Sequence, residues 1–325
     1  MGAGAIGCYL GGRLLASGVP VVLVGRASVA AEVAEHGLRL TDYRGFDRTL
    51  QAQVSTGPEA LAGCDVVLVT VKGGATAEAG RAIAPVVGAR TPIVSFQNGV
   101  NNPEVLREVL PGRRVLAGMV PFNVLRREGG WFHQGTSGRL AVERAESAAP
   151  LVEALRRAGL PTRAHADMRG VLWGKLLVNL NNSVNALAGV PIKEMLGQRD
   201  YRRVMAACVR EGIHTVAAAG VRPELDVPLP ARVVPFVLEL PDAIFSLVAR
   251  PMLHVDPEAR SSMWDDLSRG RRTEIDALNG EVVRLAGELG RVAPVNAAVV
   301  ALVKAAETHG SPSITAADLR AKLGV

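Results

Sequence analysis

The sequence has few cysteines, few aromatic residues and no long apolar run. Its three cysteines among 325 residues lie far apart, so they predict neither a disulfide framework nor a cysteine-ligated metal site. No apolar stretch approaches the roughly 20 residues of a membrane-spanning helix, and the glycine-rich start is unlike a secretory leader. We therefore expect a cytoplasmic protein with reduced cysteines and no membrane partner.

Charge of one sign is not concentrated anywhere along the chain. The net charge of +6 comes mostly from scattered arginines, a distribution typical of a solvated surface and not of a nucleic-acid-binding stripe. The six histidines form no close pair with the spacing of metal ligands, so we assign no metal site. The expected partner is a small molecule, and the sequence leaves open whether the chain works alone or as a homodimer.

What the sequence does contain is an alternation of strand and helix patterns in its first half. Valine-rich apolar runs at 19–24, 66–71, 91–96 and 114–120 alternate with helical patterns, which predicts a parallel sheet covered on both faces. Strand patterns at 131–134 and 139–143 predict an added hairpin.

The second half shows only helical spacing. After about residue 166 the strand patterns stop, and helices are predicted at 168–187, 201–219, 233–248, 259–268, 275–289, 297–309 and 313–323. We therefore predict an α/β Rossmann-type dinucleotide-binding domain at 1–166 and an all-α substrate and catalytic domain at 167–325.

A glycine turn at the start of the chain matches the dinucleotide-binding pattern G-x-G-x-x-G. Its glycines allow the tight turn, the approach of the pyrophosphate and the packing of helix on strand, while amides at the helix start face the anion. The residues expected to bind the cofactor here are Gly2, Gly4, Ala5, Ile6 and Gly7. A strand normally precedes this turn and here only Met1 does, so we expect the natural chain to begin further upstream.

The end of the predicted strand at 19–24 favours NADP over NAD. An NAD site usually places an acid at this strand end to bind the ribose hydroxyls, but there is no acid between Gly7 and Glu32. Arg26 lies about 20 residues past the turn, and its guanidinium would match a 2′-phosphate. The alternative is that Arg26 is an ordinary solvated loop residue.

Polar residues follow two further predicted strands. Lys72 follows the first of these strands, at 66–71, and Asn98 follows the second, at the carboxyl edge where ligands of open α/β sheets bind. The alternatives are a solvated lysine and a turn residue before Gly99.

The segment 173–185 places a lysine and several asparagines within an apolar helical pattern. Lys175, Asn179 and Asn182 share one helix face. Asparagine is a poor helix former, so this stripe is typical of a ligand-facing surface, although a hydrogen-bond network between helices would also produce it. Desolvation would lower the pKa of Lys175 towards neutrality, which suits a general acid that protonates the alkoxide left by hydride transfer.

Two later segments add polar groups. Ser262 lies in the first, at 261–266, and Glu274 lies in the second, at 272–280. Thr273 is a candidate helix cap, so Glu274 is either a first-turn acid that favours the helix dipole or a functional group that pairs with a lysine or binds a substrate hydroxyl.

These residues resemble the 2-dehydropantoate 2-reductase (ketopantoate reductase) family. The resemblance extends from Gly2 to about Asn296 and is carried by the glycine turn, Arg26 and five motifs: Val69-Thr70-Val71-Lys72, Gln97-Asn98-Gly99, Trp173-Gly174-Lys175, Ser261-Ser262-Met263 and Thr273-Glu274-Ile275-Asp276. It implies a Rossmann domain joined to an all-α domain like the C-terminal domain of 6-phosphogluconate dehydrogenase, with both ligands in the cleft between them. It also implies reduction of ketopantoate to pantoate by NADPH, a step of pantothenate and coenzyme A biosynthesis.

The resemblance also implies individual roles. Lys175 is similar to the family's general acid and Glu274 to the carboxylate that orients the ligands. The implied substrate contacts are Asn98, Asn179, Ser183 and Ser262, and the implied cofactor contacts are Arg26, Lys72, Asn98 and Glu274.

Two departures from the family pattern concern the far end of the substrate. Ser183 stands where members often have a second asparagine, and Lys193 stands where another asparagine often occurs. A reductase of another branched 2-keto acid therefore stays open. So do a β-hydroxyacid or glycerol-phosphate dehydrogenase and a non-catalytic NADP-binding sensor.

Overall fold

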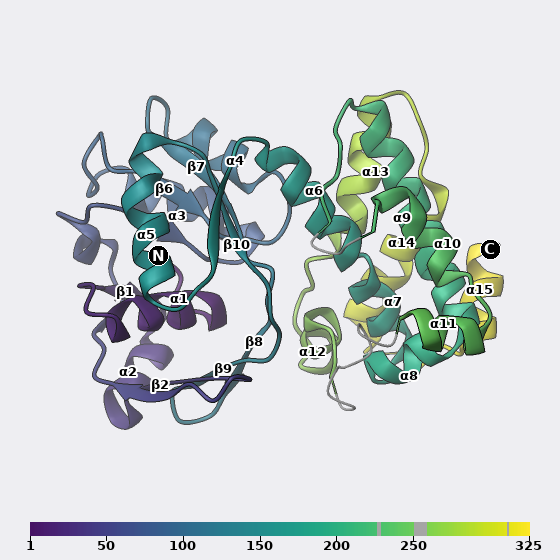
Figure 1. Ribbon diagram of the computed structural model, residues 1–325, viewed down its shortest axis with the longest axis horizontal. Coiled ribbons are helices and arrows are strands. Elements are labelled where there is room, and N and C mark those ends of the chain that lie inside the picture. Colours follow the sequence, from purple (N-terminus) through teal and green to yellow (C-terminus); the bar gives the residue numbers. More distant parts are fainter. Residues whose placement is uncertain (226–228, 250–258, 311) are drawn as a thin grey trace. The chain divides into compact units, whose positions relative to one another are not determined.

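The computed structural model describes residues 1–225, 229–249, 259–310 and 312–325, and it divides into two compact units. The first unit comprises Met1–Met168 and the second Arg169–Val325. The sequence predicted the boundary two residues earlier, between residues 166 and 167. Figure 1 shows strands and helices in the purple-to-teal part of the chain. In the second unit, the described residues form helices and no strand. The predicted fold class, an α/β Rossmann-type unit followed by an all-α unit, is confirmed.

The main sheet of the first unit has five strands, and most of its pairs are parallel. Only β10 and β7 pair antiparallel among these neighbours. In spatial order the strands are β11 (Thr162–His165), β10 (Leu140–Glu143), β7 (Val115–Met119), β6 (Ile93–Ser95) and β5 (Val67–Val69). A shorter parallel pair consists of β1 (Leu23–Val24) and β4 (Val54–Ser55).

The first residues of the chain join these two sheets. The α-amino group of Met1 donates to the Leu68 carbonyl of β5 at 2.8 Å, while the amides of Gly2 and Ala3 both donate to the Val24 carbonyl of β1 at 2.8 Å. The start of the chain therefore lies between β5 and β1, where the first strand of a Rossmann sheet belongs.

A separate four-stranded sheet packs within the same unit. Its order is β3 (Asp47–Leu50), β2 (Leu38–Asp42), β9 (Trp131–Gln134) and β8 (Val124–Arg127). The predicted hairpin is therefore wrong: β9 and β10 are both strands, but they belong to different sheets. Strand β9 pairs with β2 along one edge and with β8 along the other, and β10 pairs in the same way with β7 and β11. Neither strand has an edge left at which the two could pair with each other.

Helix α1 (Ala5–Ala16) is fixed to this smaller sheet by a buried ion pair. Arg13 and Asp42 lie 3.1 Å apart, with only 7% and 9% of their side chains exposed. The same guanidinium bonds to the hydroxyl of Tyr9, which in turn donates to Gln134 of β9 at 2.8 Å. The helix that begins at the glycine turn is thus held in place by buried polar contacts. The other α-helices of this unit are α2 (Ala27–His36), α3 (Thr76–Ile83), α4 (Asn102–Val109) and α5 (Ala149–Arg157).

The second unit packs helices of very different lengths. They are α6 (Met168–Asn179), α7 (Asn181–Ala188), α8 (Ile192–Gly197), α9 (Arg199–Ala218), α10 (Val234–Leu238), α11 (Asp242–Val248), α12 (Ser262–Ser268), α13 (Asn279–Glu288), α14 (Pro294–His309) and α15 (Ala316–Leu323). Three predicted helices are each broken in two, one of them at Leu278, between the 3-10 turn Ile275–Ala277 and α13. Leu180 separates α6 from α7, and Pro241, which has no amide hydrogen to donate, stands just before α11.

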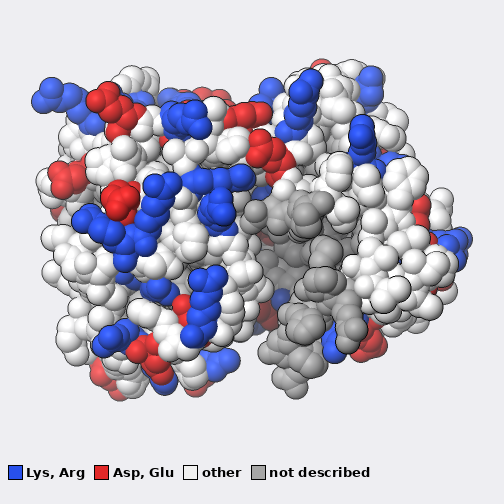
Figure 2. Space-filling model, in the orientation of Figure 1, with Lys and Arg blue, Asp and Glu red and all other residues white. Residues whose placement is uncertain are grey.

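Charges of both signs are mixed on the surface. Figure 2 shows Lys and Arg side chains interspersed with Asp and Glu over the first unit on the face drawn. Several of them form ion pairs, such as Arg107 with Glu104 and Arg126 with Glu32. No helix in the described ranges is long and apolar enough to cross a bilayer.

Candidate active site

The glycine turn has the geometry of an anion cradle. A Cβ on Gly2, whose φ is +103°, would lie 2.6 Å from the Val71 amide nitrogen, and a Cβ on Gly7 would lie 2.1 Å from the Gly2 carbonyl oxygen. A Cβ on Gly4 would meet no described atom within 4 Å, so this side of the turn is open. The first bond of α1 runs from the Cys8 amide to the Gly4 carbonyl, which leaves the amides at 5–7 outside the helical ladder. The turn fits a dinucleotide pyrophosphate.

Arg26 is exposed at the carboxyl end of β1 and is the N-cap residue of α2. The next acidic residue in the chain, Glu32, is already engaged: it pairs with Arg126 and accepts the Gly130 amide at 3.0 Å. The Glu32 carboxylate is therefore not offered to a ribose, whereas the Arg26 guanidinium lies at the strand end.

A buried hydrogen-bond network joins the loops that carry Lys72 and Asn98. The side-chain amide of Gln97 donates to the Thr76 hydroxyl at 2.7 Å, and this hydroxyl also bonds to the side-chain oxygen of Asn102 at 2.7 Å. The side-chain nitrogen of Asn102 then donates to the Asn98 carbonyl at 2.5 Å. The same Gln97 nitrogen also donates to the Val71 carbonyl at 3.0 Å, so the network supports the backbone next to Lys72 and at Asn98.

Two members of this support, Thr76 and Asn102, were missed by the sequence reasoning. Both stand at the start of a helix, as Thr76 begins α3 and Asn102 begins α4, and both are buried. Polar residues in first helical turns usually suggest capping. Nothing in the sequence pairs two helix starts that lie 26 residues apart.

Lys175 lies on α6, where its side chain is half-buried next to the buried Trp173 and Leu176. Desolvation lowers the pKa of Lys175 from 10.5 to about 8, and the negative charge of Glu274 opposes this shift. The lysine and the carboxylate predicted from separate motifs are therefore coupled within the second unit.

Gly174, beside this lysine, lets another segment of the chain cross α6. A Cβ at this position would lie 1.8 Å from the Glu224 carbonyl oxygen. The amide of Glu224 also donates to the Gly170 carbonyl at 3.0 Å. The glycine of the Trp173-Gly174-Lys175 motif is thus required by backbone contact one residue away from the candidate acid.

Ser262 is placed by its neighbour Ser261, which caps α12 and ties it to α7. The Ser261 amide donates to the side-chain oxygen of Asn185 at 2.9 Å, and its hydroxyl donates to the Asn182 carbonyl at 3.1 Å. The same hydroxyl oxygen accepts the Trp264 amide at 3.2 Å. Ser262 is therefore an exposed residue at an anchored helix start beside α7. Asn185 and Ser261 are structural supports that sequence reasoning did not identify.

The remaining predicted substrate residues differ in accessibility. Asn179 is half-buried at the end of α6, and Lys193 is exposed on α8. Ser183 is fully buried and its hydroxyl donates to the Leu180 carbonyl at 2.9 Å. The break between α6 and α7 thus separates Asn179 from the core-facing Ser183.

Glu274 is half-buried and stands immediately before the short 3-10 turn Ile275–Ala277. The hydroxyl of Thr273 accepts the Ile275 amide at 3.2 Å, so it closes a local turn around Glu274. Glu274 precedes α13, which begins at Asn279, so it is not an acidic residue of the first turn of that helix.

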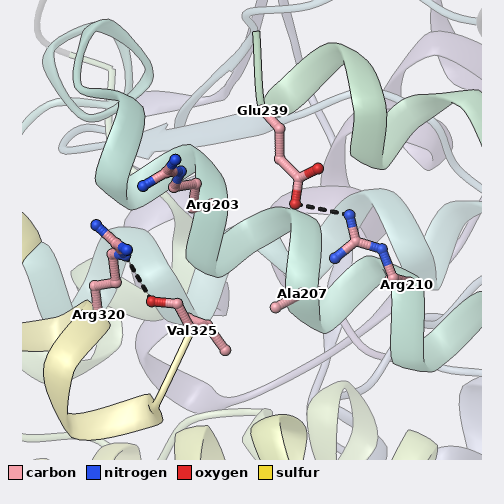
Figure 3. Close-up of a pocket in the computed structure, with 6 residues that line it drawn as sticks. All are labelled: Arg203, Ala207, Arg210, Glu239, Arg320 and Val325. Atoms are coloured by element: carbon pink, nitrogen blue, oxygen red, sulfur yellow. Dashed lines mark hydrogen bonds and ion pairs between the residues drawn. The ribbon is translucent and has the colours of Figure 1, made fainter. Parts of the chain in front are cut away.

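A pocket of about 280 Å³ occurs elsewhere in the second unit (Figure 3). It is lined by Arg203, Ala207, Arg210, Glu239, Arg320 and Val325. Its three guanidinium groups already face oxygen atoms: Arg210 pairs with Glu239 at 2.7 Å, Arg320 donates to the Val325 oxygen at 2.6 Å, and Arg203 lies 3.6 Å from Asp200. This pocket has compensated charge and is separate from the predicted residues.

A metal centre has no obvious place in the described ranges, where no group of three or more His, Cys, Asp and Glu side chains is arranged to hold an ion. His254, one of the six histidines considered above, lies outside these ranges.

Comparisons with known proteins connect both units to one family. The family model described as ketopantoate reductase PanE/ApbA matches residues 1–147, and the model of its C-terminal domain matches residues 167–307. The chain is 31% identical over 316 residues to a 2-dehydropantoate 2-reductase of Halobacterium salinarum, covering 95% of this chain and 98% of that protein.

Solved structures show the same architecture. A PanE/ApbA family ketopantoate reductase from Ralstonia eutropha JMP134 matches with a TM-score of 0.81 at 32% identity, covering 95% of this chain and 97% of that one. A D-mandelate dehydrogenase solved with NADH and anilino(oxo)acetate matches with a TM-score of 0.80 at 22% identity over 95% and 97% of the two chains. The second likeness concerns the fold alone.

Proposed function

Because the chain belongs to the ketopantoate reductase family, we propose that it is an oxidoreductase that reduces 2-dehydropantoate to pantoate with NADPH, in the pathway to pantothenate and coenzyme A. The observation that carries this proposal is the placement of Lys175, half-buried on α6 and within the electrostatic influence of Glu274. Desolvation at this position lowers the pKa of Lys175 to about 8. A lysine with this pKa is protonated at neutral pH and releases its proton readily, as a general acid must.

The first unit would hold the dinucleotide, which supplies a hydride when bound. Gly4 leaves room for the pyrophosphate, and the helix-start amides of Ala5, Ile6 and Gly7, which lie outside the α1 ladder, would donate to it. Arg26 would bind the 2′-phosphate and so select NADPH over NADH. Lys72 and Asn98, on their shared support, would contact the dinucleotide from the neighbouring strand ends.

The second unit would supply the proton. As the carbonyl carbon accepts hydride, the carbonyl oxygen gains negative charge and takes the proton from Nζ of Lys175. The neutral amine then regains a proton from solvent. Glu274 favours the charged lysine before the reaction and would also orient the ligands.

Asn98, Asn179 and Ser262 are the proposed substrate contacts. Ser183 is the weakest of the expected contacts, because its hydroxyl is buried and already donates to Leu180. This burial favours a second candidate function, reduction of another branched 2-keto acid by the same chemistry. The ratio of kcat/KM values for ketopantoate and for other branched or aromatic 2-keto acids decides between the two, and a clear preference for another acid rejects ketopantoate.

Lys175→Met tests the mechanism directly. We expect turnover to fall by about 10²- to 10⁴-fold, the usual contribution of a general acid, while the Kd of NADPH is unchanged. Lys322→Met, which removes an exposed lysine of α15, is the matched control and should retain full turnover. Turnover of Lys175→Met equal to that of the control would reject the proposed mechanism.

A further inference from the structure

One carboxylate from another helix holds Thr273, the residue before Glu274, and Thr273 in turn holds Ile275, the residue after it. A single oxygen of Glu307, on α14, accepts both the amide and the hydroxyl of Thr273, each at 2.7 Å. The same hydroxyl accepts the Ile275 amide at 3.2 Å. Two fixed amides therefore bracket Glu274, and both depend on the position of the Glu307 carboxylate.

The far end of this loop is anchored on the same helix. Asn279 donates to the side-chain oxygen of Asn296 at 2.9 Å, and both residues are completely buried. The backbone amide and the side-chain nitrogen of Asn296 bond in turn to one oxygen of Glu211, at 2.9 and 2.8 Å. Asn296 and Glu307 are about three helical turns apart and so lie on one face of α14. This face spans the loop from one end to the other.

A third contact between α14 and the loop is of a different kind. Lys304 and Asp276 form a 2.7 Å ion pair, but their side chains are 50% and 74% exposed. Exposed ion pairs contribute little to stability. Lys304 therefore joins the same two elements without fixing them, which makes it a matched control for Glu307.

We propose that Glu307 is a positioning residue for the reaction: through Thr273 it holds the backbone of Glu274 so that this carboxylate stays directed at Lys175. The inference rests on the proposed roles of Lys175 and Glu274. A carboxylate suits this task because its hydrogen bonds are about twice as strong as those of a neutral acceptor, and here one oxygen serves two donors.

Three variants test the proposal, namely Glu307→Ala, Glu307→Gln and Lys304→Ala. Glu307→Ala should lower kcat by about 10- to 100-fold, since misplacing an active-site group by an ångström has effects of this size. It should also move the high-pH limb of the rate profile to lower pH, because a displaced Glu274 no longer raises the pKa of Lys175. Glu307→Gln keeps an acceptor oxygen and should restore most of both properties, while Lys304→Ala should resemble the wild type.

Thr273→Val provides a second route if Glu307→Ala does not fold. It removes the hydroxyl that links Glu307 to Ile275 and leaves every charge in place. We expect the same shift of the pH limb, with Thr273→Ser close to the wild type.

The outcomes separate the two proposals. Full turnover of Lys175→Met would reject the proposed role of Lys175 as the general acid, on which this inference rests. If Lys175→Met is inactive but Glu307→Ala or Thr273→Val keeps the wild-type kcat and pH limb, the positioning role of Glu307 alone is overturned. That role is also overturned if kcat falls without any movement of the limb, because a merely structural contribution would have that result.

Discussion

The pH dependence of the rate should report the desolvation of Lys175. Its pKa is lowered from 10.5 to about 8 by burial. With a pKa near 8, the protonated fraction drops from about 0.9 at pH 7 to about 0.1 at pH 9, so kcat/KM should fall about tenfold over this interval. A solvated lysine with an ordinary pKa would lose only about 3% of its protons over the same range. The two cases are therefore easily distinguished.

The assay is the initial rate of NADPH oxidation at low ketopantoate concentration, because kcat/KM reports the pKa values of the free enzyme. Glu274→Gln should shift the high-pH limb to lower pH, since the carboxylate raises the pKa of Lys175. The Kd of NADPH, measured at each pH, serves as the control. A wild-type rate that stays level through pH 9, or a limb that Glu274→Gln leaves in place, would refute the reasoning.

The same pKa shift links folding stability to pH. Folded Lys175 holds its proton less tightly than the unfolded chain does, so between about pH 8 and pH 10.5 the folded state binds fewer protons and stability rises with pH. Below about pH 8 the charged lysine costs at most about 3 kcal/mol, and less where water reaches the half-buried side chain. Lys175→Met should therefore raise the unfolding midpoint at neutral pH while it abolishes turnover, a gain in stability at the expense of activity.

Three further predictions follow from single contacts. Arg26→Ala should raise the Kd of NADPH by about 10- to 100-fold and leave the Kd of NADH unchanged, because it removes charged hydrogen bonds to the 2′-phosphate. Equal effects on both Kd values would contradict the proposed contact between Arg26 and the 2′-phosphate. Gly174→Ala places a Cβ 1.8 Å from the Glu224 carbonyl and should lower the free energy of unfolding by several kcal/mol. Gly287→Ala, in open space on α13, should instead add up to about 1 kcal/mol by denaturant titration. Thr76→Val should weaken dinucleotide binding severalfold in a titration, while Thr76→Ser should not.

The sequence predicted those parts of the site whose chemistry is local. Gly2 and Gly7 are recognisable because the tight turn leaves no room for a side chain, and this constraint lies within a few residues. Arg26 is recognisable because its offset from the turn is fixed by the length of one helix and one strand. Lys175 stands out as a charge within an apolar helix.

The supports of the site could not be predicted, because each depends on a partner far away in the chain. Asn102 is 26 residues from Thr76, and Glu307 is 34 residues from Thr273. Alternation of apolar and polar residues likewise predicts that 131–134 is a strand, but it does not predict which strands pair with it. Tertiary pairing decides both questions.

The break at Leu180 bears most directly on substrate choice. A continuous helix would extend one polar face from Lys175 past Asn179, but α6 ends there and α7 begins anew, with Ser183 turned into the core. Under the proposed function, Ser183 is then not the group that contacts the far end of the substrate. Ser262 is exposed at the start of α12, and α12 is tied to α7 through the backbone and hydroxyl of Ser261. If Ser262 contacts the substrate as proposed, we expect selectivity among 2-keto acids to depend on how α12 packs against α7, a contact that no periodicity in the sequence encodes.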